Sequence, residues 1–264
     1  MAATSYHIAV IGSGPAGLSA AARAAFHDRE DGRGSPSHVL LEGHDCHART
    51  IQRYQKRKFV MAEPGFLDLR SDLAFAAGSR EEILDRWAEG IEALGIHARY
   101  GATVKSVEGS QGAFRIALAD GAVVEAEHVV LAIGLEGNPR KLGVPGEDLP
   151  TVQYHLEDPD EFRGERIVVV GAGDSALENA LALAAGNEVV VVNRRAEFSR
   201  AKDGNLAAIL AAISDPDTPL SCFYESSPAR VEATPGEDKA LRLVLDTPSG
   251  EQEVPCDRII ARLG

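Results

Sequence analysis

Short runs of consecutive apolar residues recur along the chain, and glycine directly follows several of them. Such runs are typical of strands that are buried on both faces of a parallel sheet. Alanine-rich stretches of helix length lie between them, and alanine is the residue most favourable to a helix. The pattern predicts two β-α-β units, with strands at 7–11, 39–41, 167–170 and 188–192 and helices at 16–26 and 174–185.

The segments outside these units carry other patterns. Residues 27–37 are polar and contain glycine and proline, which predicts a loop, and residues 44–80 are expected to be irregular. Ser79-Arg80-Glu81-Glu82 is a capping box, and it predicts a helix that ends near Leu94, before Gly95. A β-meander is predicted at 104–108, 113–118 and 123–127, further strands at 129–133, 220–224, 241–245 and 258–261, and a helix at 205–213.

These elements predict an α/β protein with two tandem Rossmann-like three-layer ββα dinucleotide-binding domains. The first domain is expected at 1–140 and the second at 150–262. Residues 134–150 are rich in glycine and proline and form the expected linker. The chain has 264 residues, of which 44% are hydrophobic, and this is enough for two modest cores.

Composition narrows the class of function. The net charge is −13 and the sequence has no long basic run, which argues against nucleic acid and against anionic membranes as partners. No apolar stretch reaches the ~18 residues of a membrane span, and the start of the chain lacks the basic region of a signal peptide. Three cysteines without a CxxC motif fit a reducing compartment, so we expect a cytoplasmic protein.

The first glycine-rich turn has the context of a dinucleotide fingerprint, because a strand precedes it and a helix follows. Its first glycine allows the tight turn, the second lets a pyrophosphate approach, and the third allows close packing of helix on strand. The helix start offers free N–H groups to phosphates, and Glu42 is placed to bind ribose hydroxyls. A plain strand-to-helix turn is the alternative. The fingerprint consists of Gly12, Ser13, Gly14, Pro15, Ala16 and Gly17.

The second fingerprint ends in alanine, which the motif permits. It consists of Gly171, Ala172, Gly173, Asp174, Ser175 and Ala176. The next strand ends in Asn193-Arg194-Arg195, where a site for NAD would carry an acid. Guanidinium groups match phosphate oxygens in charge and geometry, so this strand end predicts NADPH rather than NADH. Arg200 and Lys202 extend the expected pocket, and a solvated basic turn is the alternative.

Together these motifs resemble the thioredoxin-reductase-like flavoproteins of the pyridine nucleotide–disulfide oxidoreductase class. The likeness covers nearly the whole chain and also rests on Leu131–Gly134 and Gly143–Glu147. It implies FAD at the first fingerprint, NADPH at the second, and a homodimer as a common assembly. For FAD it implies the first fingerprint together with Glu42, Gly43, Val104, Ile133 and Gly134. For NADPH it implies Gly171, Gly173, Asp174, Ser175, Ala176, Asn193, Arg194, Arg195 and Arg200.

Two features depart from the family pattern. Thioredoxin reductases carry a redox CxxC before the second fingerprint, and here Tyr154 and Glu157 stand at those positions. A dithiol relay needs a thiolate nucleophile, so thioredoxin reduction by that route is excluded. Residues 155–162 resemble the relatives without the motif, the ferredoxin–NADP reductases and bacillithiol disulfide reductases. The family's returning FAD segment is expected beyond Gly264, which suggests a piece of a longer protein.

The expected reaction is hydride transfer from NADPH to FAD, followed by electron transfer to an iron–sulfur protein or a small acceptor. The hydride step needs no side-chain acid or base, so no catalytic residue is predicted. Two alternatives stay open. One is a regulatory module that senses NADPH or FAD without turnover, and the other is a flavin monooxygenase-like enzyme, whose own signature between the fingerprints is absent.

Other candidate sites carry weaker signals. The loop His44–His47 contains metal-ligand residue types but has no partner cluster, so no metal site is predicted. The basic stretch Arg49–Lys58 is either a solvated loop or a docking patch for an acidic electron-transfer partner. Cys222 and Cys256 are expected to be buried small hydrophobes. Tyr154 or His155 would lie beside the flavin, at the place of the relatives' cysteines.

Overall fold

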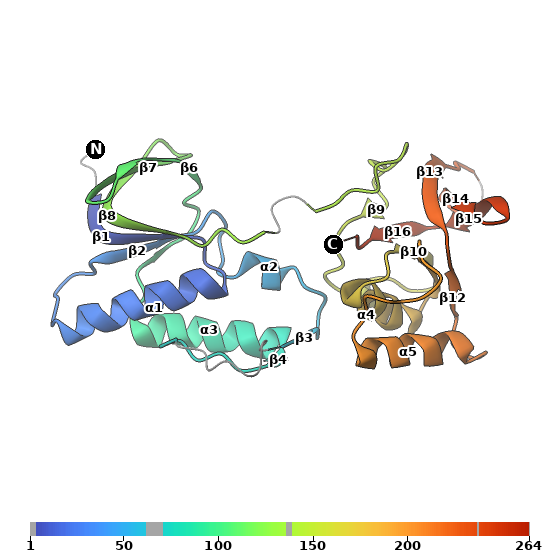
Figure 1. Cartoon of the computed structure of the whole chain (residues 1–264), viewed down its shortest axis with the longest axis horizontal. Coiled ribbons are helices and arrows are strands. Elements are labelled where there is room, and N and C mark those ends of the chain that lie inside the picture. Colours follow the sequence, from blue (N-terminus) through green and yellow to red (C-terminus); the bar gives the residue numbers. More distant parts are fainter. Residues whose placement is uncertain (1–3, 62–70, 136–138, 237, 264) are drawn as a thin grey trace. The chain divides into compact units, whose positions relative to one another are not determined.

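The computed structural model describes residues 4–61, 71–135, 139–236 and 238–263. The chain folds into two compact units. The first unit consists of Met1–Arg53 with Arg57–Gly137, and the second of Tyr54–Lys56 with Asn138–Gly264. Each unit contains its own sheet with a parallel core and with helices packed on it (Figure 1).

The first unit is built on a six-stranded sheet. Its strands are β1 (Thr4–Ile11), β2 (His38–Leu41), β5 (Ala98–Arg99), β6 (Val104–Ser110), β7 (Ala113–Leu118) and β8 (Val123–Leu131), and its helices are α1 (Pro15–Glu30), α2 (Arg49–Gln52) and α3 (Arg80–Leu94). The strand order is β5-β2-β1-β8-β7-β6, parallel from β5 to β8 and antiparallel beyond. A separate pair joins β3 (Phe59–Val60) and β4 (Gly78–Ser79).

Three layers form the core of the first unit. α1 packs against β1 and β2, and it buries Leu18 and Ala21 completely. β7 lies on the side of β1 away from α1 (Figure 1). Ile11 of β1 shares a buried cluster with Ile116 and Leu118 of β7. The predicted capping box starts α3, and Gly95 ends that helix in the left-handed region. The parallel strands therefore have the helix layer on one face, and the meander at the end of the same sheet bends over the other face.

The second unit repeats this plan. Its strands are β9 (Val152–Gln153), β10 (Arg166–Val170), β11 (Glu188–Val192), β12 (Leu220–Phe223), β13 (Ser227–Ala233), β14 (Leu241–Thr247), β15 (Gly250–Cys256) and β16 (Arg258–Ala261), and its helices are α4 (Asp174–Ala184), α5 (Asp203–Ser214) and the 3-10 turn η1 (Pro159–Glu161). The parallel sheet has the order β12-β11-β10-β16-β9. β13, β14 and β15 form an antiparallel sheet of their own.

Neighbouring residues of β10 face different layers. Ile167 and Val169 belong to a cluster that contains Leu177 of α4, whereas Val168 belongs to a cluster that contains Leu243 of β14. A strand buried on both faces has no polar alternation, which is why its sequence reads as a continuous apolar run. The second unit is thus an α-layer, a parallel sheet and an antiparallel sheet, and the expected α/β class is confirmed.

Several predicted boundaries are wrong. The loop expected at 27–37 begins only after Glu30, because α1 continues through Asp28, whose side chain has buried partners. The strands expected at 123–127 and 129–133 are one strand, β8, which pairs with β7 and with β1. β13 and β15 were not foreseen. The assignment of residues 1–140 to FAD and of residues 150–262 to NADPH stays a prediction.

A helix that spans a bilayer needs about 20 predominantly apolar residues. Across the described ranges, no helix combines the length with the apolar character that crossing a membrane requires.

Candidate functional site

Three glycines have different roles in the turn between β1 and α1. Gly12 has a φ of +98°, and a Cβ there would overlap the carbonyl oxygen of Ala132. A Cβ at Gly17 would overlap the carbonyl oxygen of Gly12. By contrast, a Cβ at Gly14 would meet no atom of the described residues within 4 Å. The fold itself requires Gly12 and Gly17, whereas Gly14 leaves open space at the helix start, where a phosphate can approach the backbone.

Glu42 follows β2 and turns its carboxylate toward this glycine turn. Its side chain is buried, and its Oε2 accepts hydrogen bonds from the backbone N–H of Ser13 (3.0 Å) and from the Ser13 hydroxyl. Its Oε1 accepts from the backbone N–H of His44 at 2.9 Å. A carboxylate has about four lone-pair positions. These three donors therefore fix Glu42 and still leave acceptor capacity for a ribose hydroxyl.

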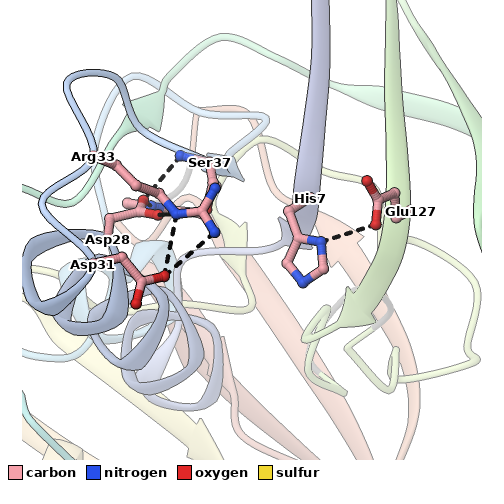
Figure 2. Close-up of polar contacts among 7 residues, drawn as sticks. His7, Asp28, Asp31, Arg33, Ser37 and Glu127 are labelled. Carbon is pink, nitrogen blue, oxygen red and sulfur yellow. Dashed lines mark hydrogen bonds and ion pairs between the residues drawn. The ribbon is translucent and has the colours of Figure 1, made fainter.

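Asp28 anchors the connection from α1 to β2 (Figure 2). Its carboxylate accepts from the backbone N–H (2.9 Å) and hydroxyl of Ser37 and from Nδ1 of His38 at 2.7 Å, and Arg33 lies close by. Burial raises the pKa of Asp28, but the hydrogen bonds from Ser37 and His38 outweigh it and lower this pKa below its usual value. The anchor returns the chain to the sheet, so that Glu42 reaches the glycine turn despite the long connection.

The turn between β10 and α4 has a related geometry. Gly171 has a φ of +139°, and a Cβ there would overlap the carbonyl oxygen of Arg262. A Cβ at Gly173 would meet no described atom within 4 Å. Ala176, at the position of the third glycine, is fully packed in the core beneath α4. This turn therefore offers the same open helix start as the first one.

A second strand-end turn follows β11. Asn193 is buried, its Oδ1 accepts from the backbone N–H of Arg195 (3.0 Å), and its Nδ2 donates to the carbonyl oxygen of Glu197 (3.0 Å). Arg194 and Arg195 are exposed, and Nη1 of Arg195 donates to the hydroxyl of Ser199 at 2.7 Å. The neutral Asn193 shapes the turn internally, and the two arginines that directly follow it are exposed.

Arg200 lies beside the open Gly173. The backbones of the two residues form an isolated parallel bridge, and the Arg200 side chain is exposed. Asp174, the first residue of α4, reinforces this arrangement, because its Oδ1 accepts from the backbone N–H of Lys202 and from Nδ2 of Asn205, both at 2.9 Å. The fold thus brings the basic loop to the helix start that the second fingerprint forms.

The remaining residues expected at the first site gather at the same edge of its sheet. The hydroxyl of Thr103, next to Val104, donates to the carbonyl oxygen of Gly43 at 3.3 Å. Ile133, beyond β8, is 73% exposed, and Gly134 follows with a φ of +66°. All lie near the carboxyl ends of β1, β2 and β8, the edge at which open α/β sheets bind ligands.

Two weaker candidates have protein partners in the structure. Nζ of Lys56, in the basic stretch 49–58, forms an ion pair with Asp158 at 2.9 Å. The hydroxyl of Tyr154 donates to Glu147 (3.0 Å) and accepts from the backbone N–H of Leu142 (3.3 Å). Tyr154 therefore holds the segment 142–147 in place.

The three cysteines lie in environments that disfavour the thiolate. Burial raises the pKa of Cys222 and of Cys256 to about 12. Burial and the neighbouring Asp45 raise the pKa of Cys46 as well. Cys256 is buried as expected, but Cys222 is only partly buried. A thiol with a pKa near 12 is protonated at neutral pH and is a poor nucleophile.

Sequence reasoning missed the polar contacts that hold the sites together. The bond of Ser13 to Glu42 joins residues 29 apart, and the bond of Asn205 to Asp174 joins residues 31 apart. No local pattern marks such pairs. The available signal was the position of the two acids. Glu42 directly follows a predicted strand, and Asp174 is the first residue of a predicted helix.

Two Rossmann-like units, each with an open glycine turn after its first strand, define a two-domain dinucleotide-binding oxidoreductase. The model of the pyridine nucleotide-disulphide oxidoreductase family matches residues 9–216. The chain belongs to this family, and the expected resemblance is confirmed. It is an NAD(P)H-dependent flavoprotein oxidoreductase.

Individual relatives agree with this placement. A ferredoxin–NADP reductase of Ignicoccus hospitalis is 29% identical over 260 residues, which are 97% of this chain and 75% of that protein. The thioredoxin reductase of Lactococcus lactis has a TM-score of 0.74 at 25% identity and is matched over 98% of this chain and 77% of its own. The bacillithiol disulfide reductase of Staphylococcus aureus has a TM-score of 0.80 at 20% identity, over 99% and 77%. At 20% identity, the likeness to the bacillithiol disulfide reductase shows a shared fold.

Proposed function

We propose that the protein is an NADPH-dependent FAD enzyme that delivers electrons to an iron–sulfur protein rather than to a dithiol. The observation that carries the proposal is the contrast between the two open glycine turns. A buried carboxylate follows the strand beside the first turn, and exposed arginines follow the strand beside the second. Two different dinucleotides, of which only one has an additional phosphate, account for this contrast.

FAD at the first turn is supported by the open Gly14, by the N–H groups at the start of α1, and by the spare acceptor capacity of Glu42. The pyrophosphate would lie at the helix start and the ribose hydroxyls at Glu42. The other proposed FAD contacts are Gly12, Ser13, Pro15, Ala16, Gly17, Gly43, Val104, Ile133 and Gly134.

NADPH at the second turn is supported by the open Gly173 and by the cations that surround it. We assign the 2′-phosphate to Arg194 and Arg195, and the neighbouring Arg200 adds a third positive charge. The arginines are exposed and reach a ligand without the burial of an unpaired charge. The other proposed contacts are Gly171, Asp174, Ser175, Ala176 and Asn193.

A bound flavin supplies the chemistry, since it accepts a hydride from a nicotinamide and releases electrons singly. The residues of this chain bind and orient the two nucleotides. Glycine turns hold the pyrophosphates, and the residues after β2 and β11 select the ribose and its phosphate. Hydride transfer moves no proton to the protein, so we assign no side-chain acid or base.

An iron–sulfur acceptor is supported by the thiols and by the relatives. No cysteine pair is spaced as CxxC, and burial keeps the Cys222 and Cys256 thiols protonated at neutral pH. Proteins named ferredoxin–NADP reductase are among the relatives, at 27–30% identity. Flavin electrons in this chain therefore leave directly to a partner that accepts them one at a time.

The nucleotide assignment is tested with the double substitution Arg194→Ala, Arg195→Ala in the FAD-supplemented chain. Each charge-assisted contact contributes about 1.5–3 kcal/mol, so we expect the NADPH affinity to fall about 100-fold and the NADH affinity by less than about threefold. Calorimetric titration measures both affinities. Arg163→Ala, an exposed arginine between η1 and β10 of the same unit, is the matched control. An equal loss of both nucleotides contradicts the assignment.

The acceptor is tested by anaerobic reduction of the FAD-loaded chain with NADPH, followed by addition of a plant-type [2Fe–2S] ferredoxin or of oxidised thioredoxin. We expect the flavin absorption to bleach with NADPH and to recover only with ferredoxin. Recovery with thioredoxin contradicts the proposal. A flavin that binds but never bleaches indicates the sensing module, and rapid recovery with oxygen and hydroxylated product indicates a monooxygenase.

A further inference from the structure

His7, Glu127 and His128 form a group of three metal-binding side chains away from the glycine turns. Each offers one ligand atom, and these atoms lie within 4.8 Å of one another. Nδ1 of His7 lies 2.9 Å from Oε2 of Glu127, a contact drawn in Figure 2. The rings of His7 and His128 meet edge to face, with centroids 5.0 Å apart. Two imidazoles and a carboxylate thus converge.

The backbone that carries this group is the centre of the six-stranded sheet. His7 lies on β1 and the other two residues on β8, and these strands pair in parallel. The register matches Tyr6 with Ala126 and Ile8 with His128, so His7 and Glu127 lie at the same level. Backbone hydrogen bonds from the N–H of His7 to Ser37 (2.7 Å) and from the N–H of Gly112 to Glu127 (2.8 Å) also hold this placement, so the group is preorganised by the sheet.

We propose that His7, Glu127 and His128 bind one divalent transition-metal ion of the zinc type. Imidazole nitrogen and carboxylate oxygen are common ligands of such ions, and a set of three leaves one position for water. Magnesium and calcium prefer sets made of oxygen ligands only, which two imidazoles do not provide.

The distances allow the site to close. Bonds of about 2.0–2.1 Å in a tetrahedral zinc site place ligand atoms roughly 3.4 Å apart. The present separations of up to 4.8 Å therefore need a closure of about 1.4 Å at most. The side chains of His7 and Glu127 are 54% and 57% exposed, so rotation about their side-chain bonds accomplishes this without repacking the core.

Charge also favours a cation at this place. The hydrogen bond between His7 and Glu127 shares one proton, and a metal ion replaces that proton. Glu127 contributes one negative charge, and the neutral imidazoles contribute lone pairs. The bound ion would carry a net positive charge of one, in a protein whose formal net charge is −13.

Another histidine nearby shows the contrasting case of a fully used imidazole. His38 is completely buried, Nδ1 lies 2.7 Å from Asp28, and Nε2 accepts the backbone N–H of His97 at 3.0 Å. Neither nitrogen is available to a ligand. The loop His44–His47, with its suggestive composition, is not among the groups of three converging ligands in the described residues.

The position of the group assigns it a role separate from hydride transfer. His7 precedes Gly12 by five residues along β1, which corresponds to roughly 16 Å at the rise of a strand. A metal ion there ties β1 to β8 and stabilises the sheet that presents the first glycine turn. It does not contact a nucleotide bound at that turn.

Zinc binding by the full chain tests the proposal, with a chromophoric chelator as competitor. We expect one tight zinc ion per chain, and about tenfold or greater loss of affinity in His7→Ala and in His128→Ala. The melting temperature of the wild type should rise with zinc, and that of His7→Ala should not. Cobalt(II) should show the visible bands of a four-coordinate nitrogen and oxygen site in the wild type, and these bands should be absent from His7→Ala and from His128→Ala.

Two control variants separate this group from other ligands. His27→Ala removes an exposed histidine of α1, and Cys46→Ser removes the thiol from the loop 44–47. Both should keep the zinc affinity and the cobalt bands of the wild type. Unchanged zinc affinity in the double variant His7→Ala, His128→Ala overturns the proposal, and so does loss of the tight zinc ion in Cys46→Ser. Circular dichroism confirms that each variant is folded.

Discussion

The two glycine turns share one pattern but differ in how strictly the fold requires each glycine. In both, a Cβ at the first glycine would overlap a backbone carbonyl of the neighbouring strand segment, and a Cβ at the second would meet no atom of the described ranges within 4 Å. The third position differs, since Gly17 has no room for a methyl group and Ala176 is packed. The comparison separates glycines that the fold needs from those that leave room for a ligand.

The residues after the second strand differ in direction as well as in charge. The carboxylate of Glu42 points inward and binds the glycine turn through Ser13. The amide of Asn193 shapes its own turn and leaves Arg194 and Arg195 outward. One strand end thus carries a buried hydrogen-bond acceptor, and the other carries two exposed guanidinium groups, which are hydrogen-bond donors.

The connections from helix to second strand form a third contrast. In the first unit the carboxylate of Asp28, hydrogen-bonded to His38, anchors the long connection. In the second unit the neutral Asn187 is buried, its Oδ1 accepts from the backbone N–H of Glu165, and its Nδ2 donates to the carbonyl oxygen of Leu183. Only the first anchor can respond to pH.

Exchanging the third residues of the fingerprints should produce the largest effect. Gly17→Ala forces a methyl group against the carbonyl oxygen of Gly12, so we expect a loss of about 3 kcal/mol or more in the free energy of unfolding. Ala176→Gly removes a buried methyl group and should cost about 1–2 kcal/mol. Urea unfolding measures both, and similar losses in the two variants would contradict the distinction.

The second glycines supply the matched control for that exchange. Gly14→Ala and Gly173→Ala place a methyl group in open space, with backbone angles that alanine adopts. Stability should change by less than about 0.5 kcal/mol, while FAD binding in the first variant and NADPH binding in the second should weaken at least about tenfold. Unimpaired binding in both would remove the pyrophosphate from these turns.

Removal of the side chains that follow β2 and β11 should have the next largest effect. Glu42→Ala leaves the N–H groups of Ser13 and His44 without their acceptor, and we expect a loss of about 1–3 kcal/mol together with weaker FAD binding. Asn193→Ala affects a turn among exposed residues and should cost about 1 kcal/mol. Denaturant unfolding and FAD titration compare them, and a larger cost for Asn193→Ala would reverse the ranking.

Acid should distinguish the two helix-to-strand anchors. The pKa of Asp28 is lowered in the folded protein, so its contribution to stability is present above its ordinary pKa of about 3.9 and is lost as the pH falls through the lowered value. At neutral pH, Asp28→Ala and Asn187→Ala should each cost about 1–3 kcal/mol. Towards pH 3 the cost of Asp28→Ala should shrink, and that of Asn187→Ala should stay constant. Urea unfolding at several pH values decides.

The smallest expected effect concerns the hydrogen bond that restrains Arg195. Ser199→Ala removes the exposed acceptor of its Nη1, which should change stability by less than about 0.5 kcal/mol. The guanidinium keeps its charge, so NADPH affinity should fall less than about threefold. An effect as large as that of Arg195→Ala would mean that orientation, rather than charge, determines the affinity of this arginine.

Much of the fold was predictable from local pattern. Apolar runs located β1, β2, β10 and β11, because the part of a strand that lies between two layers is buried on both faces. The capping box and Gly95 gave the bounds of α3. The extension of α1 through Glu30 was missed, since its last turn is polar and is held by contacts of Asp28 with residues outside the helix. β13 and β15, with few buried residues, gave only a weak signal.

The sequence by itself determined the two fingerprints, the apolar strands before them, the arginines after β11 and the absence of CxxC, because each depends on neighbours along the chain. Only the tertiary structure decided which glycines are required for packing, that Glu42 binds Ser13, and that Arg200 lies beside Gly173. It also brought His7 to Glu127 and His128, 120 residues further along. Such contacts depend on strand order and register, which local periodicity does not encode.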